Sequence, residues 1–136
     1  MAHVNRAALG RTIALGALTG MRTFAGPMAL ARRHPGSLTV AIAVLGGAEM
    51  VVDKTSFVGN RIDAAPLAAR AVVGAVVGGL VAREGRNSVV FGSLLGASAA
   101  VAAAHLAYHV RTRLPISNVA AGALEDAVVI GLMKAV

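Results

Sequence analysis

Six ionisable side chains lie within or at the edges of apolar stretches of this chain, where they could bind or carry a charged solute. They are Arg22, Glu49, Asp53, Arg70, Glu125 and Asp126. A charge at the depth of a lipid bilayer is energetically costly, so such residues are kept where they pair, face water or serve a function. Thr23, which follows the first arginine directly, is counted with them as a candidate substrate- or ion-binding residue.

Glu49 and Asp53 are four residues apart, so a helix would carry both carboxylates on one face. Like charges at this spacing repel each other. An arginine, a bound cation or a shared proton would relieve the repulsion, and a shared proton could couple to transport. The alternative is that Asp53 is solvated at the membrane interface and that only Glu49 is buried and paired.

Arg22 lies near the middle of its apolar run, within the segment Gly20-Met21-Arg22-Thr23-Phe24-Ala25-Gly26-Pro27. Two glycines and a proline weaken the hydrogen bonding of a helix, so we predict a break or a kink here. Carboxylates of another helix, or carbonyl groups exposed at the break, would pair with the arginine. A cavity at the break would suit an anionic group, whereas a kink that only aids packing is the alternative.

Glu125 and Asp126 are adjacent, and adjacent residues lie about 100° apart around a helix. They cannot both face one partner, so we expect one at the bundle centre and the other toward a neighbouring subunit or the interface. Arg70 follows Pro66, a residue suited to the first turn of a helix. Arg70 would extend outward to the interface or pair with Asp53 or Glu49.

His105 and His109 are also four residues apart, and with facing carboxylates they could bind a divalent metal. A histidine pair near the end of a helix is more often packing or interface, so we predict no metal and no cofactor. The sequence has no nucleophile triad, phosphate-binding loop or dinucleotide fingerprint. A membrane enzyme is therefore the least favoured class, and we predict that the chain is not an enzyme.

The composition indicates what must position these residues. Hydrophobic residues make up 57% of the 136 positions and charged residues 14%, against roughly 45–50% and about 25% in soluble domains. Each helix of a soluble bundle would keep a broad polar face, but residues 89–106 contain only two serines and one histidine as polar side chains. We predict a single integral membrane domain over residues 1–136, in contact with the lipid bilayer.

Five apolar runs follow one another, at residues 12–30, 38–52, 67–82, 89–110 and 119–136. They predict an all-α, polytopic membrane bundle of about five transmembrane helices, with the first helix broken or kinked. The fourth run spans a hydrocarbon core of about 30 Å at about 1.5 Å per residue. The second and third are short, so they must borrow flanking residues, thin the bilayer or lie partly within the protein.

Small residues recur at every fourth position in three of the runs. They are Gly16, Gly20, Gly74, Gly78, Gly92, Gly96, Ala100 and Ala104. Such stripes let helix backbones approach closely, either within one chain or between chains. Because five short helices enclose little volume, we expect a homo-oligomer.

The net charge is +7, but the thirteen lysines and arginines are scattered between the apolar runs. Scattered charges favour anchoring at the membrane surface over nucleic-acid binding. In a five-helix topology, seven of them fall on the side of the N-terminus and five, including Arg83 and Arg86, on the other. This bias favours a cytoplasmic N-terminus, but it is small enough to leave an antiparallel homodimer open.

A short similarity within the chain favours an inverted repeat. Gly47-Ala48-Glu49 with Val51-Val52 resembles Gly122-Ala123-Leu124-Glu125 with Val128-Val129. With one helix between the two pairs of runs, the first pair would enter the membrane oppositely to the last pair. Similarity this short between helices rich in Ala, Gly and Val also arises by chance.

Four segments resemble a family of small bacterial membrane proteins described only as domain of unknown function 4126. They are Gly20-Met21-Arg22-Thr23-Phe24, Ala48-Glu49-Met50-Val51-Val52-Asp53-Lys54, Pro66 with Arg70 and Gly74, and Leu124-Glu125-Asp126. The resemblance covers most of the chain, and the Arg-Thr and Glu-x-x-x-Asp-Lys pieces are its most specific parts. It implies a multi-span bacterial membrane protein and no particular activity.

We therefore predict a multi-pass protein of the bacterial cytoplasmic (inner) membrane, with no nucleic-acid partner. The favoured function is an oligomeric transporter or channel-like protein for a small solute or ion, with an intramembrane network of Arg, Glu and Asp side chains. The alternative is a structural or lipid-associated membrane protein whose charged network only stabilises assembly.

Overall fold

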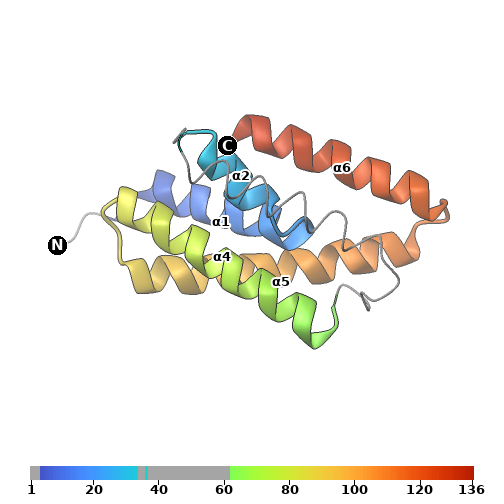
Figure 1. The fold of residues 1–136 in the computed structure, drawn as a ribbon, viewed down its shortest axis with the longest axis horizontal. Coiled ribbons are helices and arrows are strands. Elements are labelled where there is room, and N and C mark those ends of the chain that lie inside the picture. The colour runs from blue at the N-terminus through green and yellow to red at the C-terminus, as the bar shows by residue number, and fades with distance from the viewer. Residues whose placement is uncertain (1–3, 34–35, 37–61) are drawn as a thin grey trace.

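Helices make up nearly all of the chain that the structure describes. The structure, a computed structural model, describes residues 4–33, 36 and 62–136. These residues form five helices and no strand, namely α1 (Arg6–Met21), α2 (Ala25–Ala31), α4 (Ala64–Glu84), α5 (Val89–Arg113) and α6 (Asn118–Ala135) (Figure 1). The predicted all-α fold is confirmed. The second apolar run lies outside the described residues, and so does its half of the predicted inverted repeat.

Polar side chains fix the starts of three helices. Asn5, Ser88 and Ser117 each accept a hydrogen bond from the backbone N–H three residues ahead, at 3.2, 3.3 and 3.2 Å. These caps satisfy N–H groups that have no partner within the first turn of α1, α5 and α6. Pro66 lies in the first turn of α4, as predicted.

The first apolar run is not one helix. α1 ends at Met21, and the backbone of Arg22 is extended, with φ −139° and ψ 120°. Two hydrogen bonds of 2.9 Å close the turn that follows, from the Arg22 N–H to the Leu18 carbonyl and from the Ala25 N–H to the Arg22 carbonyl. The predicted break is therefore confirmed, and it lies at the arginine itself.

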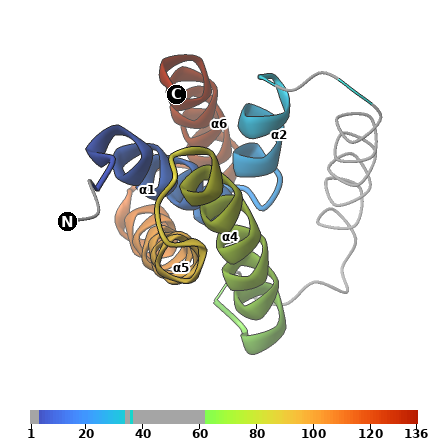
Figure 2. The same ribbon diagram turned by 90° about the vertical axis from the view of Figure 1, so that its left-hand side faces the viewer.

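Beyond the break, α2 folds back along α1, as two views at right angles show (Figures 1 and 2). Gly26 permits the close approach, because a methyl group in its place would lie 2.5 Å from the carbonyl oxygen of Leu15. The Thr19 hydroxyl donates a hydrogen bond of 2.9 Å to the same carbonyl. Residues 12–30 therefore do not cross the bundle as one transmembrane segment, as the five-helix order required, because α2 reverses direction.

α5 carries the stripe of small residues on which α1 and α4 pack. Its buried residues are Gly92, Gly96, Ala100 and Ala104. A methyl group on Gly16 of α1, or on Gly74 of α4, would lie 2.7 Å from the carbonyl oxygen of Gly96. The predicted helix contacts are confirmed, and the structure places them within one chain.

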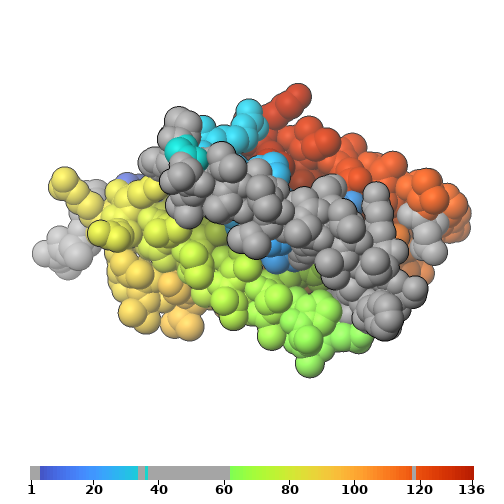
Figure 3. All heavy atoms as spheres, viewed as in Figure 1, coloured from blue at the N-terminus to red at the C-terminus, as the bar shows by residue number. Residues whose placement is uncertain are grey.

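α6 packs less closely than the other long helices. In the space-filling view it lies along one edge of the molecule, and α4 lies along the other (Figure 3). The core between them contains Leu15, Leu18, Val77 and Val81, each at most 2% exposed, whereas the buried residues of α6 are Ala121 and Val129.

Two helices, α4 and α5, are long and apolar enough to cross a membrane, as judged from their length and composition. α4 directs Val72, Val76 and Leu80 outward, with exposures of 63%, 57% and 41%. α1 and α6, with 16 and 18 residues, would reach about 24 and 27 Å at about 1.5 Å per residue.

The start of α1 and the turn between α4 and α5 lie at the same end of the bundle. The Asn5 N–H donates to Oδ1 of Asn87 at 3.0 Å, and Nδ2 of Asn87 donates to the Asn5 carbonyl at 3.1 Å. Arg11 of α1 and Glu84 of α4 form an ion pair of 3.8 Å beside them. Below, this end is called the amino end.

This arrangement corrects the predicted topology. The five-helix order placed Arg83 and Arg86 on the side opposite to the N-terminus, but both lie at the amino end, next to Asn87. The reversal at Arg22 is the physical reason. It turns the first apolar run back toward the amino end, so α4 runs in the opposite direction to α1, whereas the five-helix order made the two parallel. The count of seven against five basic residues therefore no longer applies.

Candidate functional site at the helix break

The guanidinium of Arg22 forms an ion pair and hydrogen bond, through Nη2, with Oδ1 of Asp126. The pair joins the end of α1 to the middle of α6. Its side chains are 27% and 48% exposed, so neither is deeply buried within the chain. In water such a pair would contribute about 0–1 kcal/mol to the stability of the fold. In a bilayer an unpaired charge is more costly, so the pair would contribute more.

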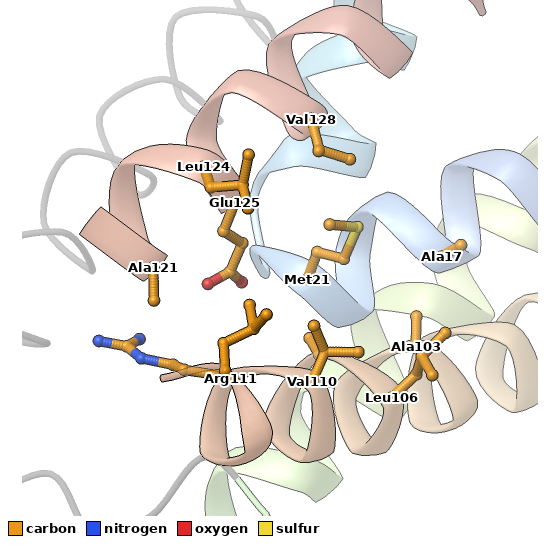
Figure 4. A pocket seen from close by; sticks show the side chains of 12 residues that line it. Ala17, Met21, Ala103, Leu106, Val110, Arg111, Ala121, Leu124, Glu125 and Val128 are labelled. Carbon is orange, nitrogen blue, oxygen red and sulfur yellow. The ribbon is translucent and has the colours of Figure 1, made fainter. Parts of the chain in front are cut away.

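A cavity of about 320 Å³ lies beside this pair, between α1, α5 and α6 (Figure 4). Most of its wall is apolar. The larger apolar side chains are Met21, Leu106, Val110, Leu114, Leu124 and Val128. A cavity of this size, with a mostly apolar wall and few charged groups, has the properties of a site for a small ligand.

Two charged residues complete the lining, Glu125 of α6 and Arg111 of α5. The Glu125 carboxylate points from α6 into the space between α6 and α5, and the Arg111 side chain extends along the edge of the cavity (Figure 4). Both side chains have interaction partners. The cavity therefore offers one acidic and one basic group at positions fixed by two different helices.

The cavity and the ion pair are neighbours along both helices. Met21 and Glu125, which line the cavity, directly precede Arg22 and Asp126. The two acidic residues of α6 thus have different surroundings, as expected for adjacent positions on a helix. Asp126 pairs with Arg22 at the break, and Glu125 lines the cavity.

At the break, the backbone groups of Arg22 and its Nη2 have partners within the chain, whereas its Nε is buried without a hydrogen-bond partner. The Arg22 N–H donates to Leu18 and its carbonyl accepts from Ala25, while its guanidinium faces a carboxylate. The sequence predicted that an anion could bind to a guanidinium and free N–H groups here. In the structure, Asp126 already occupies the place that such an anion would take.

Comparison of the chain with protein-family models, with curated proteins and with solved structures found no match. The resemblance to the family described as domain of unknown function 4126 stays a prediction. What this site can do must therefore be argued from its own geometry.

The other predicted site residues have different positions. Thr23 is buried at the break, at 6% exposure, and Arg70 is buried in α4, at 5%. Arg70 has an interaction partner. Its burial excludes the outward position at the interface, which was one of the two positions expected for it. Glu49 and Asp53 lie outside the described residues. The structure thus brings Arg22, Thr23, Glu125 and Asp126 to the break and its cavity.

The histidine pair has local contacts in α5. Nδ1 of His105 lies 3.0 Å from the Val101 carbonyl oxygen one turn earlier. The ring of His109 meets that of Tyr108 edge-on, with the ring centroids 5.5 Å apart. Within residues 4–33, 36 and 62–136, no three His, Cys, Asp or Glu side chains are grouped so that they could hold a metal ion.

Arg111 is the charged lining residue that the sequence did not single out. It lies in the last turn of α5, where a basic residue is ordinary because it compensates the helix dipole. Its place at the cavity depends on α6 folding back beside α5 after the turn at Ser117. No local pattern in the sequence signals that contact.

Proposed function

We propose that the protein is a membrane-embedded helical bundle that carries or conducts a small solute or ion. The Arg22–Asp126 pair and the adjoining cavity form its functional centre. One observation supports this most strongly: a helix breaks at an arginine, and that arginine pairs with the last helix next to residues that line a cavity. Non-helical backbone at membrane depth is tolerated where protein or a cavity surrounds it, and broken helices form binding sites in transporters.

The outward-facing side chains support the membrane part of the proposal. α4 and α5 meet the length and hydropathy needed to span a bilayer, and exposed apolar side chains such as Val76 and Leu94, at 57% and 64%, would contact lipid. The shorter α1 and α6 would be accommodated by local thinning of the bilayer. The chain would then be a multi-pass protein of the bacterial cytoplasmic membrane, with copies associating through these faces.

The ion pair suggests how occupancy could be coupled to movement. α6 has few buried side chains, so the attraction between Arg22 and Asp126 contributes much of its attachment to α1. A proton or a cation that binds to Asp126 would compete with the arginine. Release of the pair would free α6 to move relative to α1 and α5, and this movement would change access to the cavity.

A structural role is the second candidate, and the same packing favours it. Ala121 and Val129 are the buried side chains of α6. The ion pair at Asp126 would therefore stabilise the attachment of α6 to the bundle even if nothing passes through the cavity. In that case the charged pair fixes the position of α6 and the assembly of the bundle, and the cavity holds lipid or water without transport.

Flux measurements on purified protein in liposomes separate the two. Protons are followed with an entrapped pH-sensitive dye, and Na⁺, K⁺ and Cl⁻ with ion-selective dyes, for wild type, Arg22→Gln and Asp126→Asn. Arg113→Gln is the matched control. Arg113 is exposed in the last turn of α5, at the end of the bundle opposite to the amino end.

For a transporter, the two pair variants lose flux while they still insert and assemble, and the control keeps it. For a structural role, the pair variants lose thermal stability and no protein shows flux. Unchanged assembly and unchanged flux over a broad panel of solutes would contradict both candidates.

A further inference from the structure

Basic side chains gather at the amino end of the bundle. This end holds the start of α1, the turn between α4 and α5 and, in the same half of the molecule, the C-terminal ends of α2 and α6 (Figures 1 and 2). Its basic residues are Arg6, Arg11, Arg32, Arg33, Arg83, Arg86 and Lys134. All except Arg11, which is half-buried, are exposed.

Hydrogen bonds join these four chain segments in two pairs. Asn5 and Asn87 exchange two hydrogen bonds, which joins the start of α1 to the α4–α5 turn. The Arg33 guanidinium donates to the carbonyl oxygen of Val136, which joins the end of α2 to the end of α6. The basic cluster is therefore a property of the fold, since its members come from four separate parts of the sequence.

Acidic residues do not balance this cluster. Among the described side chains of this end, Glu84 is the one acidic group, and it pairs with Arg11 at 3.8 Å. The opposite end, with the start of α4 and the α5–α6 turn, has the basic residues Arg111 and Arg113 and the acidic residue Asp63 within the described part. Among the described residues, the two ends differ strongly in charge, which the sequence-based topology did not show.

We infer that the amino end binds the anionic phospholipid headgroups of the cytoplasmic leaflet and so gives the bundle one orientation, with the start of α1 inside the cell. This inference rests on the membrane placement proposed above. Anionic lipids attract basic residues next to membrane-spanning segments, and basic residues favour the cytoplasmic side. Leu80 and Val90, exposed at 41% and 71% beside the turn, continue the apolar surface up to the arginines, whose long stems can reach the headgroups.

The inference also bears on assembly. An antiparallel homodimer requires that the chain insert in both orientations, and the nearly even sequence count left this open. With most of the described basic residues at one end, a single orientation is favoured, so copies in an oligomer would be parallel.

Single cysteines test the orientation directly, because the chain has none of its own. Val4→Cys marks the amino end and Ile116→Cys the opposite end, at positions with similar exposures of 56% and 43%. Intact cells are treated with a membrane-impermeant maleimide. We expect Ile116→Cys to react in intact cells and Val4→Cys to react only after permeabilisation. Equal labelling of both, or labelling of Val4→Cys alone, overturns the inference.

Charge variants test the lipid surface itself. Arg83→Gln removes one charge from the amino end, and Arg113→Gln removes one from the other end as the matched control, because both side chains are exposed in the last turn of a helix. Phosphatidylglycerol added to the detergent-solubilised protein should raise the Tm of wild type and of the control. We expect a much smaller shift for the amino-end variant, and no shift for any protein with phosphatidylcholine.

Equal shifts for Arg83→Gln and Arg113→Gln would overturn the lipid surface. Failure of the underlying membrane placement has a different signature. In that case alkaline carbonate would extract the protein from the membrane fraction, and both cysteines would stay unlabelled in intact cells. That result overturns the membrane placement and this inference together.

Discussion

Arg22 and Asp126 form an ion pair although 104 residues separate them in the sequence. The arginine stands where α1 ends, and the aspartate lies in the middle of α6. Each would be costly to keep alone in an apolar bundle. Their pairing therefore gives a physical reason why opposite charges occur in two otherwise apolar segments.

Neutral replacement of either partner should destabilise the bundle. Arg22→Gln or Asp126→Asn leaves one charge without its partner, so we expect the free energy of unfolding to fall by about 1–3 kcal/mol. This lies between an exposed pair, at about 0–1 kcal/mol, and a buried one, at roughly 3–5 kcal/mol. Unfolding by denaturant in bicelles measures it, and the double variant should lose less than the sum of the two. Strict additivity would show that the pair does not couple.

The glycine at the contact of α4 with α5 should not tolerate a methyl group. In Gly74→Ala the new methyl would lie 2.7 Å from both the Gly96 carbonyl oxygen and the Ala100 Cβ, so we expect a loss of about 1–3 kcal/mol. Gly122→Ala in α6 is the control, because nothing lies within 4 Å of its position. Helix propensity there favours alanine by up to about 1 kcal/mol. Thermal unfolding in detergent should show shifts of opposite sign, and a similar loss at both sites would contradict this packing.

The outward face of α4 distinguishes a membrane protein from a soluble bundle. Val76→Asp places a carboxylate on a side chain that is 57% exposed. If lipid covers this face, insertion costs about 2.5–3.5 kcal/mol more, and the fraction of protein that resists carbonate extraction should fall. Val4→Asp, at 56% exposure before α1, should have little effect. Two variants with the same membrane fraction as wild type would argue against lipid contact at Val76.

The sequence predicts the helix break but not what the chain does after it. Glycine and proline around Arg22 weaken the helix, and this is a local effect that the sequence displays. The reversal of α2 depends on Gly26 fitting against the Leu15 carbonyl, which is a contact between two turns of different helices. Because the sequence does not display that reversal, the five-helix order places Arg83 and Arg86 on the wrong side.

The site was predictable in the same partial way. Charged residues in apolar runs indicate functional positions through the cost of burial, and the spacing of Glu125 and Asp126 predicts that they face different surroundings. Which of them meets Arg22 depends on the rotation of α6 about its own axis. That rotation is set by tertiary packing, through side chains such as Val129, and small apolar residues on several faces of α6 leave it undetermined in the sequence.

The proposed transport function requires that water reach the cavity beside the ion pair within the membrane. Val128 lines the cavity and Ile130 does not, yet both lie in α6 at nearly the same depth and are 44% and 55% exposed. The rates at which Val128→Cys and Ile130→Cys react with a water-soluble maleimide, in permeabilised membranes, test this requirement directly. We predict much faster reaction at Val128→Cys, because Ile130→Cys would face lipid, where thiolate is scarce. Equally slow reaction at both positions would contradict a water-filled cavity and the transport function proposed from it.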